Sequence, residues 1–231
     1  MSSLNLDKAL IDLLEDLRTD FSISFEIKNI DYCEVFQKNE TAIIYYNPKI
    51  IDTESIVHEL LHIWLSRFGC NIGNRIFLST ITNEKLNKVL NKCLCDHINN
   101  CCSHVKMYPK YIKMGYTPSK FLINSLAPKV SLKDIREINL QFLGYYNANS
   151  LNFFIGSLIS ILADHLDIDY GEHHPILKNK DNLLYKIITD FWNKWVKFDI
   201  ENVDPRFNSD YELTDSLIAD LTVWTEFKKI K

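Results

Sequence analysis

The chain holds 231 residues, 46% of them hydrophobic and 24% charged, which is the balance of an ordinary globular protein rather than a fibrous or disordered one. Its net charge of −4, without any basic block, gives no reason to expect nucleic acid as a partner. The longest apolar stretch, Leu151 to Ala163, is too short to span a bilayer, and Met1 to Asp7 do not resemble a secretory signal. We therefore expect a cytoplasmic protein with no membrane partner.

The first part of the chain predicts a helix and then a small sheet. Apolar residues recur at helical spacing from Leu4 to Leu17, whereas Phe21 to Ile27 alternate between apolar and polar residues, which is the period of a half-buried strand. Residues 32–36 and 41–46 have a similar strand composition. We expect these strands to form a small antiparallel sheet packed against the helix that follows.

That helix carries the most informative motif, His58-Glu59-Leu60-Leu61-His62. Two histidines four positions apart lie on the same face of a helix and can bind one metal ion. Glu59 points about 100° round the helix from His58, so its carboxylate can reach a water on the metal rather than the metal itself. The motif predicts His58 and His62 as zinc ligands and Glu59 as the general base.

The surroundings of the motif bear on this interpretation. Asp52 or Thr53 can cap the helix, and apolar residues flank the motif at 56–57 and 63–65, so the helix is expected to be buried. Burying an unpaired polar group costs several kcal/mol, so the polar residues of the motif need partners. A metal ion would supply them. The alternative is a pair of core histidines, with Glu59 in a salt bridge.

After the motif helix the sequence predicts only helices. A turn at residues 69–74 leads to a long helix from Asn83 to Val105, which Pro109 stops. Gly144 ends a later helix, and residues 173–175 are predicted to form an exposed loop. The expected later helices span residues 119–126, 131–143, 150–166, 183–198 and 214–229. The fold class is therefore α+β with a mostly helical C-terminal half, and we place the boundary between the core and the helical region after residue 116.

A catalytic zinc site needs a third protein ligand, and the long helix offers four candidates. Asp96, His97, Asn100 and His104 fall within about 100° of arc on one helix face. We favour His104, because neutral imidazole is a strong zinc ligand; the other three are alternative ligands or groups that orient a ligand histidine. No oxyanion donor is preferred among Tyr145, Tyr146, His165, Tyr170, His173 and His174.

From residue 41 to residue 115 the chain resembles the zincin superfamily of zinc metallopeptidases, and among them small members such as the ImmA/IrrE-like peptidases. The resemblance is carried by the motif and by the order of strand, turn and helix around it. It implies that an edge strand, here Thr41 to Tyr46, binds an extended substrate. It also implies a third ligand followed one turn later by a polar partner, a spacing that Asp96 and Asn100 match ahead of Pro109. The family more often has glutamate at the first of these positions.

The expected function is zinc-dependent peptide-bond hydrolysis, with Zn²⁺ as cofactor and Glu59 accepting a proton from the metal-activated water. The resemblance implies a restricted intracellular protein substrate, bound as an extended strand. A second function also fits the sequence, that of a non-catalytic zincin-like protein that binds metal or regulates a partner.

Overall fold

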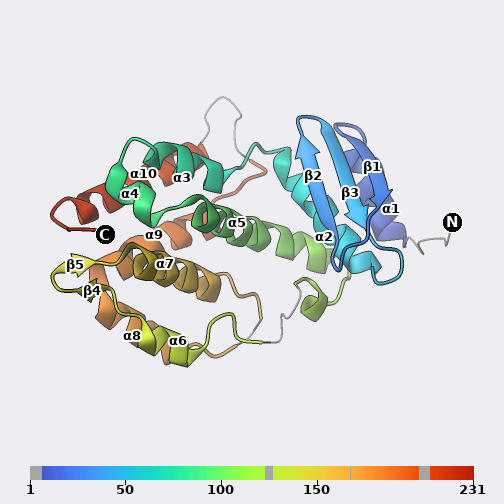
Figure 1. Ribbon diagram of the computed structural model, residues 1–231. Helices are drawn as coiled ribbons and strands as arrows, with labels where there is room; N and C mark the ends of the chain where they lie inside the picture. The colour runs from blue at the N-terminus through green and yellow to red at the C-terminus, as the bar shows by residue number, and fades with distance from the viewer. Residues whose placement is uncertain (1–6, 123–126, 167, 203–208) are drawn as a thin grey trace. The chain divides into compact units, whose positions relative to one another are not determined.

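The computed structural model describes residues 7–122, 127–166, 168–202 and 209–231 (Figure 1). It confirms the α+β class, with a three-stranded sheet near the N-terminus and mostly helices after it. The chain divides into two compact units, one of residues 1–69 and 106–126 and the other of residues 70–105 and 127–231. This division differs from a boundary after residue 116, because the chain enters the second unit at residue 70 and returns to the first at residue 106. Among the described residues, no helix is long and apolar enough to cross a membrane.

The sheet of the first unit has the strand order β1-β3-β2. Strands β2 and β3 pair antiparallel, but β1 and β3 pair parallel, so the expectation of a wholly antiparallel sheet is wrong for one of its two pairings. The elements are α1 (Lys8–Leu17), β1 (Ser22–Ile27), β2 (Glu34–Lys38) and β3 (Thr41–Tyr46). Residues 4–6 of the predicted first helix lie outside the described residues.

Strand β3 is central, which corrects the expectation that it forms the edge of the sheet. The physical reason lies in its composition. Strand β3 contains no charged residue and fully buries Ala42 and Ile44, whereas β1 contains Glu26 and β2 contains Glu34 and Lys38. Charged residues suit edge strands because they oppose pairing with further chains. The edge strand that contacts the motif helix is therefore β2.

The motif helix, α2 (Thr53–Ser66), begins where the sequence predicts. Asp52 is its N-cap, and the Asp52 Oδ1 accepts a hydrogen bond of 2.9 Å from the backbone N–H of Ser55. One side of α2 is fully buried against the sheet and α1 through Ile56, Leu60 and other apolar residues. This burial fixes the rotation of the helix and so fixes the direction in which the two histidines point.

The next three helices after α2 begin at asparagines, of which the sequence predicted only Asn83. Asn71, Asn83 and Asn91 each accept a hydrogen bond from the backbone N–H three residues later. Each therefore caps a new helix, so the expected turn at 69–74 gives way to a helix and the expected single helix over 83–105 is two. These three helices are α3 (Ile72–Thr80), α4 (Glu84–Val89) and α5 (Lys92–Lys113).

Three further expectations are corrected. Helix α5 continues past Pro109, because this proline is exposed and the carbonyl that loses its hydrogen bond can be hydrated. The helix predicted over 131–143 ends at Glu137, and a hairpin turning at Leu143 and Gly144 follows. Residues 173–175 begin a helix, in which Pro175 occupies the first turn, where no backbone donor is needed.

The remaining elements are η1 (Pro118–Lys120), α6 (Leu132–Glu137), β4 (Gln141–Phe142), β5 (Tyr145–Tyr146), α7 (Ala148–Leu162), α8 (His173–Lys180), α9 (Asn182–Lys197) and α10 (Ser209–Thr225). Of the helix predicted over 119–126, residues 123–126 lie outside the described residues.

Within the second unit, α3 crosses α5 at Gly73, where no side chain fits. A Cβ at this position would lie 2.6 Å from the Cβ of Asn99 and would overlap the carbonyl oxygen of Cys95. Gly73→Ala should therefore lower the free energy of unfolding by about 2 to 3 kcal/mol, measured by urea denaturation. Gly156→Ala is the matched control, because its nearest contact is the flexible end of Leu94 at 3.3 Å. Equal costs for the two substitutions would contradict this account of the crossing.

Candidate metal centre

Helix α2 places His58 and His62 one turn apart on the same face. Their ring centroids are 5.0 Å apart, and the planes are inclined by 71°. The His58 ring also packs against Phe121, with the centroids 4.9 Å apart. Phe121 is buried and follows η1. The ring of His58 is thus held by contacts on more than one side.

Helix α5 contributes the third histidine, His104. The division of the chain passes through this continuous helix just after residue 105, so the turn that follows His104 belongs to the same unit as α2. Those later turns pack on the first unit: the rings of Tyr108 and Tyr111 lie 5.2 and 5.0 Å from that of Phe121, and the Lys110 Nζ lies 4.8 Å from the ring of Trp64. These contacts hold the part of α5 that directly follows His104.

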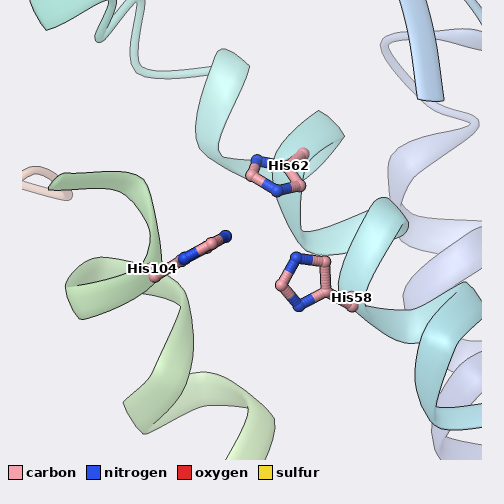
Figure 2. A group of neighbouring side chains, drawn as sticks. All are labelled: His58, His62 and His104. Carbon is pink, nitrogen blue, oxygen red and sulfur yellow. The ribbon is translucent and has the colours of Figure 1, made fainter. Parts of the chain in front are cut away.

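The three histidines form one cluster, with ligand atoms that all lie within 4.8 Å of one another. Figure 2 shows the three rings turned toward a common space, two from α2 and one from α5. Tetrahedral zinc with Zn–N bonds of about 2.0 to 2.1 Å needs nitrogen atoms roughly 3.4 Å apart. Side-chain movements on the order of 1 Å therefore suffice, and three imidazoles are a donor set that suits zinc.

Glu59 is not a member of this cluster of ligand atoms. Its Oε2 accepts a hydrogen bond of 3.1 Å from the backbone N–H of Val35, in strand β2. The bond uses a donor that the pairing of β2 with β3 leaves free, and it ties the carboxylate to the outer edge of the sheet. Glu59 thus follows the candidate ligand His58 in α2 and lies outside the cluster, so the role it could take beside a metal is that of a general base rather than a ligand.

Burial sets the protonation of two groups in the metal-free site. It lowers the pKa of His62 to about 4, so this imidazole is neutral near pH 7 and available as a ligand. Burial, with a smaller contribution from the charge of Glu34, raises the pKa of Glu59 to about 8, while the Val35 N–H opposes the rise. A divalent cation nearby would favour the carboxylate form of Glu59.

These pKa values predict how the stability of the metal-free protein depends on pH. The Glu59 pKa is raised from 4.5, so its contribution to stability is lost as pH rises toward 8. The lowered pKa of His62 acts in the opposite sense, but only below about pH 6.5. Between pH 6.5 and 8 the free energy of unfolding should therefore fall by roughly 2 kcal/mol in chelator. Urea denaturation should show the fall in the parent and not in Glu59→Gln; the same fall in both would contradict it.

The structure does not bring the other candidate ligands into the cluster. His97 faces α7, where its Nε2 lies 2.9 Å from the Oγ of Ser160 and 3.2 Å from the carbonyl oxygen of Gly156. Asp96 is exposed and forms an ion pair with Lys92, one turn earlier in α5. Asn100 is exposed on the same helix. Only His104, of the four residues on the predicted face, joins His58 and His62.

The oxyanion donors that the sequence suggested have local partners in the second unit. Tyr170 donates to Asp164 and accepts from the backbone N–H of Lys129, the His173 ring lies 3.2 Å from the Val130 carbonyl, and His174 contacts Tyr185. Tyr145 and Tyr146 lie beneath lysines near the end of the chain. His165 lies three residues after Leu162, the last residue of α7.

Sequence reasoning missed two residues that belong to the site. Val35, whose backbone positions Glu59, leaves no signal in the sequence, because a backbone donor can come from any residue type except proline. Tyr108 could have been found, because it follows His104 by four positions and so shares its helix face. Its ring reaches Phe121, which also contacts His58.

Comparison with known proteins gives no family against which to test the zincin resemblance. No family model, curated protein or solved structure matches the chain. The interpretation of the site therefore depends on its own residues, above all on the three converging histidines and on Glu59.

Proposed function

We propose that the chain is a zinc-dependent peptidase in which His58, His62 and His104 hold the metal. The single observation that carries this proposal is the convergence of these three imidazoles, with Glu59 next to His58 in α2 and outside their ligand set. Three histidines leave a fourth position for water, as catalytic zinc sites do and structural ones do not.

The roles of the residues follow from their chemistry. Zinc, when bound, lowers the pKa of its water toward neutrality and polarises the carbonyl of the scissile bond. Glu59 accepts the proton of that water, and the Val35 N–H keeps the carboxylate oriented. Tyr108 is the candidate donor to the oxyanion, because it lies one turn beyond His104 on the same face.

The substrate is proposed to bind as an extended strand along β2 rather than β3, since β3 is paired on both sides. Strand β2 is also the one that contacts Glu59. A hollow of about 400 Å³ lies beside it, lined by Lys28, Glu34, Val35, Phe36 and Tyr45. Its aromatic and charged walls would receive a substrate side chain and restrict which sequences are cleaved. All six cysteines are free thiols, which supports the proposed cytoplasmic location of such an enzyme.

One observation favours the second candidate, a non-catalytic metal-binding or regulatory protein. The Glu59 carboxyl is buried, has a raised pKa and accepts a hydrogen bond from the sheet, as a structural carboxyl would. In such a protein the metal would stabilise the fold or a binding surface, and no peptide would be cleaved.

Metal analysis and peptide cleavage test the proposal together. Protein purified without added zinc should contain about one zinc per chain. Cleavage of a library of quenched fluorescent peptides should disappear in chelator and return with zinc. Zinc without cleavage of any peptide or of candidate protein substrates would favour the second candidate. The absence of zinc binding would refute both the peptidase and a metal-binding role.

A further inference from the structure

The β4–β5 hairpin ends in two large apolar residues that are exposed. Phe142 and Leu143 keep 69% and 81% of their surface exposed. Leu143 has a φ of 50° and Gly144 a φ of 79°, so the turn has two residues in the left-handed region. Asparagine or glycine is the usual choice at the first of these positions, because leucine there is strained. A strained and solvent-exposed leucine needs a reason other than folding.

A second apolar tip lies next to the hairpin, just beyond α10. Phe227 is 91% exposed. The two tips are joined, because Tyr146 of β5 donates to the Lys229 carbonyl, at 2.7 Å, and accepts from the Lys231 N–H. Figure 1 shows the hairpin and the end of α10 together at one end of the helices of the second unit.

Three lysines, at positions 228, 229 and 231, lie over aromatic rings next to the two tips. Lys228 Nζ lies 4.5 Å from the Trp224 ring, and Lys231 Nζ and Lys229 Nζ lie 3.6 and 5.8 Å from the Tyr145 ring. Within the part of the chain that the structure describes, none of the three lysines forms an ion pair. Residues 226–231 contain these three lysines and one glutamate, a net charge of +2, in a chain whose total is −4. The positive charge is thus local.

We propose that this tip patch, made of Phe142, Leu143, Phe227, Lys228, Lys229 and Lys231, binds the surface of a bilayer that contains anionic lipids. Apolar side chains on projecting turns can enter the boundary between headgroups and acyl chains, while a collar of lysines attracts the anionic headgroups. Tyr145 and Tyr146 suit the same interfacial depth. The expectation of no membrane partner came from the lack of a spanning segment, which a surface-bound protein does not need. The proposal is independent of the zinc site.

Flotation with lipid vesicles tests the patch. The full chain should bind phosphatidylcholine vesicles that contain phosphatidylserine, bind vesicles of phosphatidylcholine alone much more weakly, and dissociate as salt is raised. Leu143→Asn and Phe227→Ser should each weaken binding roughly tenfold, because each removes an apolar side chain that enters the bilayer. Lys229→Gln should weaken it about fivefold, and only with the anionic vesicles.

The stability of the variants separates this role from a structural one. Leu143→Asn should unfold at the same temperature as the parent or higher, because asparagine tolerates a positive φ. Val196→Asn is the control, because Val196 is an apolar residue that is 46% exposed but lies far from the tip patch along α9. Asp181, at the start of α9, accepts a hydrogen bond from Trp224, whereas Val196 lies near the other end of that helix. This variant should bind vesicles like the parent. The proposal would be overturned if the parent failed to bind anionic vesicles at low salt or bound both kinds of vesicle equally. It would also be overturned if Leu143→Asn bound like the parent, or if the chain bound an acidic polypeptide in place of vesicles.

Discussion

Glu59→Gln should abolish zinc-dependent peptide hydrolysis while the protein still binds about one zinc per chain. Glutamine has nearly the same shape as glutamate and can still accept the Val35 N–H, but it cannot take a proton from water. Loss of a general base lowers the rate by roughly 10² to 10⁴-fold. The measurement is kcat for a cleaved peptide, with the zinc content of the same preparation.

Glu54→Gln is the matched control for this experiment. Glu54 lies in the first turn of the same helix, and its carboxylate is 3.7 Å from the Lys120 Nζ. Its neutralisation should leave kcat within about twofold of the parent, because a partly exposed ion pair contributes little. Undiminished hydrolysis by Glu59→Gln would remove Glu59 from the mechanism, and a loss of zinc in that variant would mean that it acts as a ligand.

The local features of the site could be predicted from the sequence because they depend on residues close together in the chain. The spacing of His58 and His62 fixes their common face, and Asp52 is a good N-cap immediately before an apolar helix. The strands were predictable for the same reason, since alternation is a property of neighbouring residues. The order of the strands in the sheet was not predictable. Strand β2 follows β1 in the chain but pairs only with β3, on the side away from β1, and this depends on contacts between distant residues.

The later helices show where periodicity fails. Asn91 separates two helices within one continuous apolar pattern, because its side chain caps α5 at a point where the apolar spacing does not change. Pro109 was expected to stop α5, but whether a proline ends a helix depends on whether the carbonyl it leaves free can reach water, which is a tertiary property. The hairpin at Leu143 was hidden because that residue is a poor choice for such a turn.

The choice among ligand candidates on α5 also depends on tertiary contacts. Helical geometry places His97 and His104 on similar faces, but they are seven positions apart, and this separates them by about 10 Å along the helix axis. Over that distance α5 changes neighbours. His97 lies opposite Ser160 of α7, whereas the turn after His104 packs on Phe121 in the first unit. The sequence places both histidines on the same helix face, and it does not show which of them lies near His58 and His62.

His104→Ala should weaken zinc binding by roughly 10² to 10³-fold, because the free energy of zinc binding is shared among only three protein ligands. His97→Ala should leave zinc affinity near that of the parent. The measurement is competition with a chelating dye at neutral pH, where the lowered pKa of His62 keeps this ligand neutral in both variants. Similar losses of affinity in the two variants, or a larger loss in His97→Ala, would show that the cluster of Figure 2 is not the ligand set.

The stability of the metal-free proteins should follow the reverse order. His97→Ala removes the contacts of its ring with Ser160 and with the Gly156 carbonyl, and each partly buried hydrogen bond is worth about 1 kcal/mol. Without a cation, three imidazoles whose ligand atoms all lie within 4.8 Å of one another turn nitrogen lone pairs toward the same space. Removing one of them in His104→Ala relieves this repulsion, so the metal-free protein should lose less stability. A residue that costs affinity when removed, and little stability in the absence of metal, is one that the fold keeps for its ligand. The two measurements, zinc affinity and metal-free stability, should therefore rank His97→Ala and His104→Ala in opposite orders. If both histidines had a purely structural role, the same variant would show the larger loss in both measurements.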